Sequence, residues 1–237
     1  NYDPRVVVTL ATTPNSQTIA YLAMHQDYSA GFVTGTVLTD KRCGEIVVEK
    51  LLKAKRGHYG PFEQCHINLA LGYWDHNTLM QWFRHRIISI DCQSMRYTSE
   101  SITKVATGEK HIEESFYFRP VGWYTDRHGA KFYYSEEQRE IDKEMAFNCA
   151  VAYTERINGG MPEEQARGIL PTCYRQHCHI SLNGRSLMHI LDMRAKKDAQ
   201  LEAQQLASAV FEQFKLWMPQ VAEWYEQHQL GKAILAP

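Results

Sequence analysis

The segment from Gln81 to Tyr97 concentrates three arginines, a histidine and two serines, side chains that are mostly exposed and well suited to anions. Arginine forks bind phosphate through two parallel hydrogen bonds, and a serine hydroxyl adds a further donor. Ser94 and Arg96 are spaced so that they can hold one anion. The residues alone leave two interpretations open: a site for an anionic ligand, or a surface or interface cluster of ion pairs.

A helix is expected to position the first of these side chains. The cationic run 84–86 follows an apolar stretch, which predicts the C-terminal end of a helix opened by Asp75 or Asn77. At about 100° per residue, Gln81 and His85 would lie on nearly the same helical face, with Arg84 close by. Amide, imidazole and guanidinium donors would then serve one ligand.

An extended segment is expected to position the others. From Ser89 onward the pattern reads as a strand, in which successive side chains face opposite sides. One face would hold Cys92, Ser94 and Arg96, and the other Asp91, Gln93 and Tyr97.

Two further segments carry residues of chemical interest. In GHYGPFEQ, His58 and Glu63 flank a Gly-Pro pair that predicts a tight, exposed turn, where a histidine is ordinarily a surface or capping residue. In NGRSLMHILDMR, Arg185 and His189 stack at i, i+4, whereas Arg194 lies about 180° away on a regular helix. These groups would serve different ligands, or they are ordinary surface charges.

A zinc site is not expected, although cysteine and histidine gather at Cys173, His177, Cys178 and His179. Thiolates and imidazoles are the usual zinc ligands. The segment has no C-x-x-C or H-x-x-x-H pair, and the adjacent Cys178 and His179 would face opposite sides of an extended chain.

The composition places the chain among ordinary globular proteins. Its 237 residues are 44% hydrophobic and 22% charged, with a formal net charge of −1. We therefore expect one domain over residues 1–237, without the broad basic surface of a nucleic-acid binder. The six cysteines follow no framework spacing, and neither a signal peptide nor a long apolar span is seen, so we expect a cytoplasmic protein with reduced thiols and no membrane segment.

Regular elements are expected around these motifs. Strands are predicted at residues 6–10, 66–73 and 116–119. Helices are predicted at residues 16–28, 40–56, 135–159, 162–171, 183–194, 198–217 and 219–229.

The motifs resemble those of a known family. RHRIISIDCQSMRY closely matches the RHRxxSxNxxSxRY signature of the flavin-dependent thymidylate synthases, the ThyX family, with Asp91 in place of the asparagine. GHYGPFEQ is similar to the family's H-x-x-x-x-E motif, and ARGILP to its AR-x-x-LP element. NGRSLMHILDMR resembles its N-A-R-S-L-x-x-x-x-x-x-R element with Gly184 replacing alanine, and AQLEAQQLA follows as AQ-x-E-I does.

The resemblance implies an enzyme that methylates deoxyuridine monophosphate (dUMP). It would use FAD, NADPH as reductant and 5,10-methylenetetrahydrofolate as one-carbon donor, with no protein nucleophile. The implied fold is α/β (α+β), a single domain with a mainly antiparallel sheet flanked by helices. The implied assembly is a homotetramer with active sites between subunits.

The same resemblance implies roles for individual residues. Arg84, His85 and Arg194 would take part in catalysis. Flavin binding would involve His58, Gly60, Glu63, Arg84, His85, Arg86, Asn183, Arg185 and His189. Nucleotide binding would involve Gln81, Arg84, Gln93, Ser94, Arg96, Arg167 and Arg194.

Two departures from the family pattern lie within the signature. Asp91 replaces a neutral amide with an acid, and Cys92 occupies a position where some relatives carry glutamate. Either change can alter cofactor affinity or nicotinamide preference, but neither removes a nucleotide-binding group. The alternative of a different class is a non-catalytic nucleotide- or RNA-binding module, which would purify colourless.

Overall fold

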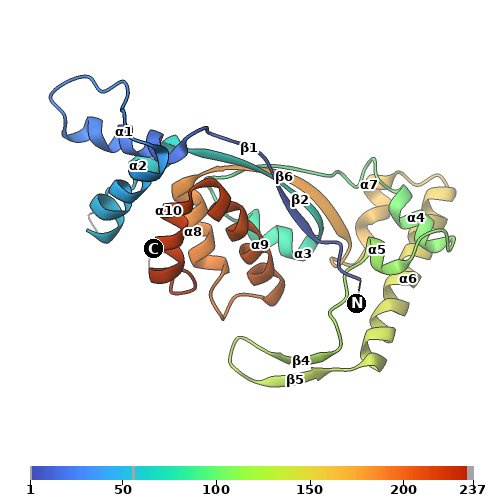
Figure 1. Cartoon of the computed structure of the whole chain (residues 1–237). Helices are drawn as coiled ribbons and strands as arrows, with labels where there is room; N and C mark the ends of the chain where they lie inside the picture. Colours follow the sequence, from blue (N-terminus) through green and yellow to red (C-terminus); the bar gives the residue numbers. More distant parts are fainter. Residues whose placement is uncertain (1, 55–56, 234–237) are drawn as a thin grey trace. The chain divides into compact units, whose positions relative to one another are not determined.

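The computed structural model describes residues 2–54 and 57–233 (Figure 1). The chain divides into two compact units that alternate along the sequence. Unit 1 contains Asn1–Val6, Leu71–Gln81 and Asp91–Cys178, and unit 2 contains Val7–Ala70, Trp82–Ile90 and His179–Pro237. The expectation of one domain over the whole chain stays a prediction.

A four-stranded sheet has the order β1-β2-β6-β3. Its strands are β1 (Val6–Thr12), β2 (His66–Asp75), β3 (Ser89–Cys92) and β6 (Arg175–Asn183). The combination of helices with an antiparallel sheet confirms the expected α/β (α+β) fold class. No helix in the described ranges has the length and apolar character needed to cross a membrane.

Unit 2 is built from helices around an apolar core. They are α1 (Ser16–Tyr28), α2 (Asp40–Val47), η1 (Val48–Lys53), η2 (Gly60–Gln64), α8 (Gly184–Arg194), α9 (Leu201–Trp217) and α10 (Pro219–His228). Phe62, Leu187, Phe214 and Tyr225 are buried in this core. α8 packs against η2 and α9, and α9 packs against α10. The end of the predicted helix 40–56 lies outside the described residues.

Unit 1 has its own core. Its elements beyond the sheet are α3 (His76–Trp82, of which the unit holds residues up to Gln81), α4 (Glu100–Ala106), α5 (Ile112–Ser115), α6 (Glu136–Asn158), α7 (Glu163–Ala166), η3 (Arg167–Ile169) and the hairpin β4 (Gly122–Thr125) with β5 (Lys131–Tyr134). The core includes Met95, Ile102, Phe116, Ala150 and Tyr153. The hairpin leads directly into α6 (Figure 1).

Side-chain caps explain where several helices begin. Ser135 accepts a hydrogen bond from the Gln138 backbone at 3.1 Å and so starts α6 as predicted. The side chain of Gln138 does not complete a capping box, because it donates to Asp142 at 2.9 Å. α1 begins at Ser16 as predicted, with Asn15 as its N-cap, and the Ser16 hydroxyl donates to the Thr13 carbonyl at 2.6 Å.

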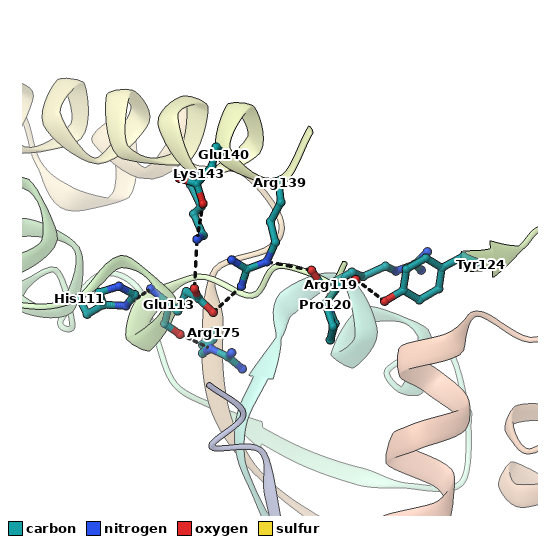
Figure 2. A network of polar contacts seen from close by, with 9 residues as sticks. All are labelled: His111, Glu113, Arg119, Pro120, Tyr124, Arg139, Glu140, Lys143 and Arg175. Atoms are coloured by element: carbon teal, nitrogen blue, oxygen red, sulfur yellow. Dashed lines mark hydrogen bonds and ion pairs between the residues drawn. The ribbon is translucent and has the colours of Figure 1, made fainter. Parts of the chain in front are cut away.

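A buried ionic network joins α5 and α6 in unit 1 (Figure 2). Arg139 and Lys143 of α6 point towards the Glu113 carboxylate, at 2.7 Å and 3.3 Å. Arg175 donates to the Glu113 carbonyl at 2.8 Å. Burial raises the pKa of Glu113, but the hydrogen bonds and charges of Arg139 and Lys143 outweigh it and lower the pKa overall.

One sequence prediction in unit 1 needs correction. Residues 116–119 form no strand, since Phe116 makes only an isolated bridge to Tyr174. In the hairpin that follows, Trp123 is 71% exposed. The side chains of this hairpin therefore add little to the unit's core.

Candidate functional site

A cavity of about 600 Å³ lies in unit 2, where three of the motifs meet. Arg84, His85 and Arg86 line one part of it, and α8 supplies Arg185 and His189. The remaining lining is Gly57, Tyr59, Glu63, Ile87, Ser186, Met188 and Ile190. Cationic donors together with apolar walls suit an anionic ligand that has a planar, apolar part.

The start of α8 fixes one side of this cavity. Asn183 accepts a hydrogen bond from the Ser186 backbone at 2.8 Å, so this predicted flavin residue also caps the helix. Arg185, the second residue of the helix, reaches Glu63 of η2 at 2.5 Å between Nη1 and Oε1. Both side chains are about half exposed, so a bound anion can compete for the guanidinium.

The histidine of the RHR motif is held neutral. Arg194 Nε donates to His85 Nε2 at 3.0 Å, so the proton of the neutral imidazole must sit on Nδ1. Burial, with the charges of Arg194, His189 and Arg84, lowers the pKa of His85 to about 4. The rings of His85 and His189 meet edge to face at 5.8 Å between centroids. At neutral pH His85 is therefore an uncharged donor beside cationic neighbours.

The RHR motif is not helical, contrary to the prediction. Asp75 does open α3, since its carboxylate accepts from the Thr78 backbone at 2.9 Å. The helix ends at Trp82, a fully buried side chain, and the His85 backbone donates back to the Trp82 carbonyl at 3.1 Å in a turn. The chain leaves the helix there to enter β3, so the predicted common helical face of Gln81 and His85 does not exist.

The two arginines of α8 have different partners, and the opposed helix faces expected for them stay a prediction. Arg185 pairs with Glu63, whereas Arg194 bonds to His85. Burial, then the nearby charge of Arg84, lowers the pKa of Arg194. The two arginines of this motif therefore serve different neighbours.

A second hollow in unit 2, of about 390 Å³, contains the other predicted flavin residues. His58, Gly60 and Glu63 line it together with Arg185. His58 Nδ1 lies 3.5 Å from an oxygen of Asp27. The segment forms a 3₁₀ helix in place of the expected tight turn; His58, Gly60 and Glu63 are exposed as expected, whereas Phe62 is fully buried. Burial of Phe62 anchors the segment to the core and forces this compact form.

Of the predicted nucleotide residues, Arg84 and Arg194 lie in unit 2. Unit 1 contains the others, which are Gln81, Gln93, Ser94, Arg96 and Arg167. β3 ends at Cys92, and the chain then turns, because the Tyr97 backbone donates to the Ser94 carbonyl at 3.1 Å. The predicted strand face that would hold Ser94 and Arg96 therefore does not exist. The turn still brings the two together, since Ser94 Oγ accepts from the Arg96 backbone at 3.3 Å.

A short helix supplies the partner of Arg96. Glu164 of α7 lies 2.7 Å from Arg96, with both side chains about half exposed. Arg167, the arginine of the AR-x-x-LP element, is exposed three residues further on in η3. The neighbouring Glu163 accepts a short hydrogen bond from Ser99 at the start of α4. The acids of α7 thus contact the segment that carries Ser94 and Arg96.

Several residues of these sites were not predicted from the sequence. Tyr59, Ile87 and Met188 line the large cavity from variable positions inside or beside the motifs. Glu164 reads as one more charge in an acidic run. For these residues the sequence offered one signal, which was their adjacency to a motif residue. Their contacts could not be predicted, because residues that are partners in the folded chain are not adjacent in sequence.

A mixed helix-and-sheet fold with a basic, partly apolar cavity suits the binding of an anionic, partly planar ligand. Comparison with known proteins gives the family. The family model described as "Thymidylate synthase complementing protein" matches residues 9–220, and the chain belongs to this family.

Individual relatives agree. The flavin-dependent thymidylate synthase of Haloarcula marismortui is 34% identical over 86% of this chain and 84% of its own, and that of Halobacterium salinarum is 31% identical over 92% and 93%. The structure of the Helicobacter pylori flavin-dependent thymidylate synthase ThyX, complexed with FAD and dUMP, has a TM-score of 0.64 and 21% identity over 87% of this chain and 92% of that one. At that identity the structural similarity establishes the fold alone.

Proposed function

We propose that this protein is a flavin-dependent thymidylate synthase that converts dUMP to dTMP. The observation that carries the proposal is the cavity of unit 2, where the RHR segment and the start of α8 together line one basic hollow. The relatives named as flavin-dependent thymidylate synthases and the family match support the same activity.

FAD fits the donor set of this cavity. Its pyrophosphate requires cationic donors, which Arg84, Arg86 and Arg185 offer beside the apolar Ile87 and Met188. Bound FAD, once reduced by NADPH, would supply the hydride that completes the new methyl group. The protein would bind it through His58, Gly60, Glu63, Arg84, His85, Arg86, Asn183, Arg185 and His189.

The protein's own contribution to the reaction is placement and charge. His85, neutral with its proton on Nδ1, would donate a hydrogen bond to developing negative charge without carrying a charge itself. Arg84 and Arg194 would add positive charge. No protein nucleophile is required in this scheme.

For the nucleotide we propose Gln81, Arg84, Gln93, Ser94, Arg96, Arg167 and Arg194. The phosphate of dUMP would compete with Glu164 for Arg96, since that ion pair is half exposed. Ser94 Oγ, close to the Arg96 backbone, would add a donor to the same phosphate oxygens.

We further propose NADPH as reductant, 5,10-methylenetetrahydrofolate as one-carbon donor, a cytoplasmic location and a homotetramer with active sites between subunits. These proposals extend the family resemblance of the four motifs. Light scattering at micromolar concentration tests the assembly: a mass near 27.4 kDa, that of the single chain, would contradict a tetramer.

Two measurements test the function. Purified protein incubated with FAD and passed through gel filtration should retain flavin absorbance, whereas a non-catalytic nucleotide- or RNA-binding module would stay colourless. The flavin-loaded protein should then form dTMP from dUMP, methylenetetrahydrofolate and NADPH. Retention of FAD without any dTMP under anaerobic and aerobic conditions would refute the synthase activity.

A further inference from the structure

Gln176 is a buried polar residue of β6 that no motif contains. Its side chain lies in unit 1 and the residue is 4% exposed, so its amide must find partners inside the protein. Its Nε2 donates to the Gln93 carbonyl at 3.1 Å, and its Oε1 lies 2.6 Å from Nδ1 of His76. The Cys92 thiol donates to the same Oε1 at 3.7 Å.

The chemistry of these partners fixes the orientation of the amide. A backbone carbonyl only accepts, so the NH2 group of Gln176 must face Gln93 and the oxygen must face His76. His76 Nδ1 must then carry its proton, which selects the tautomer. The imidazole of His76 is itself held in place, because it stacks on the Tyr174 ring with 4.9 Å between centroids and 14° between planes. The His76 backbone also donates to the Tyr174 carbonyl at 2.9 Å.

Gln93 is the last anchored residue before the turn that carries Ser94 and Arg96. Its backbone N–H donates to the His177 carbonyl at 2.8 Å, and its carbonyl accepts from Gln176. β3 has ended one residue earlier, at Cys92. Both polar backbone groups of Gln93 are thus bonded to consecutive residues of β6, and these bonds set the direction in which the turn leaves the sheet.

We propose that Gln176, oriented by His76, is a positioning residue for the phosphate-binding turn formed by residues 93–96. The inference rests on the proposed function, because it assigns that turn to the dUMP phosphate. Gln176 contacts the backbone of the turn and would not touch the nucleotide itself. Its loss should misplace Ser94 and Arg96 while the flavin cavity, built from other segments, stays intact.

The test uses Gln176→Leu in the flavin-loaded protein. We expect the Kd for dUMP to rise about tenfold or more while the Kd for FAD changes less than about twofold. Hydrogen exchange of the peptide covering residues 93–97 should be faster in the ligand-free variant than in the wild type. His76→Asn, whose side-chain NH2 can replace the Nδ1 donor, should keep dUMP affinity, whereas His76→Leu should weaken it.

Ala146→Gly is the matched control, since it weakens the buried face of α6 in unit 1 without touching the hydrogen bonds of Gln176. It should lower the melting temperature and leave the Kd for dUMP unchanged. Unchanged dUMP affinity in Gln176→Leu, equal loss of FAD and dUMP, or unchanged exchange at residues 93–97 would each overturn the positioning role. A wild-type protein that binds FAD but no dUMP would instead overturn the proposed function.

Discussion

Replacing Arg194 with methionine should raise the pKa of His85. The substitution keeps an unbranched apolar stem in α8 but removes a positive charge whose Nε lies 3.0 Å from His85 Nε2. Burial, the largest cause of the low pKa, remains, as do His189 and Arg84. We therefore expect the pKa to rise from about 4 by about one unit and to stay below its ordinary value near 6.5.

The effect on stability follows from the sign of this shift. Wild-type His85 binds its proton more weakly in the folded protein than in the unfolded chain, so stability falls as the pH drops from about 6.5 to about 4. At about 1.4 kcal/mol per pKa unit the difference is at most roughly 3 kcal/mol, and partial exposure reduces it to about 1–2 kcal/mol. In Arg194→Met this loss on acidification should be smaller.

Histidine proton chemical shifts followed by NMR between pH 3 and 8, assigned with His85→Gln, measure the pKa. Urea unfolding at pH 5 and pH 7 measures the stability difference. Arg185→Met is the control, because Arg185 lies on the same helix but pairs with Glu63. An unchanged or lowered His85 pKa in Arg194→Met, or an equal rise in the control, would refute a direct effect of the Arg194 contact.

Four further predictions concern other contacts. Arg194→Ala should weaken the binding of dUMP by on the order of 2–4 kcal/mol, whereas Arg185→Ala should chiefly weaken the binding of FAD, as titration calorimetry of each ligand would show. Equal losses of both ligands in each variant would refute this division of roles. Glu164→Gln should strengthen the binding of dUMP by up to about 1 kcal/mol, because it removes the ion pair that competes for Arg96. Weaker binding would instead mean that Glu164 orients Arg96. Glu113→Gln should lower the free energy of unfolding at pH 7 by about 3 kcal/mol. The further loss of stability below about pH 4 should be smaller in the variant, since the pKa of Glu113 is lowered and its carboxylate stabilises the fold only while it is ionised. Cys92→Ala should keep most of its activity, and mass spectrometry should find no nucleotide attached to this thiol in the wild type.

The family and the positions of its motifs could be predicted from the sequence because they depend on residue types at fixed spacing. Local capping chemistry was also readable: Ser135 starts α6 and Asp75 opens α3. These features need only neighbours within a few residues. The partners of Arg96 and His85 lie far along the chain, at Glu164 and Arg194, and no periodicity of the sequence points to them.

The helix and the strand predicted around the signature are both wrong at the point where the regular element ends and the chain turns. A helix was extended past Trp82 and a strand past Cys92, although each element stops where the chain must turn. Helical and strand periodicity describe a segment only while its backbone hydrogen bonds continue. At Ser94 the backbone bonds locally instead, so Ser94 and Arg96, which were predicted to share a strand face, lie together in a turn.

Gly184 shows how a departure from a family pattern acquires a physical reason only in the folded chain. An alanine side chain at this position would place its Cβ 3.2 Å from the Phe62 carbonyl oxygen, closer than ordinary packing allows. The Gly184 backbone also donates to the Cys65 carbonyl at 3.0 Å, so the start of α8 is bonded to the residue that follows η2. The same short gap is spanned one residue later by Arg185 and Glu63. An added methyl group would have to separate η2 from α8 by a few tenths of an ångström, and that displacement would act directly on the ion pair at the edge of the cavity.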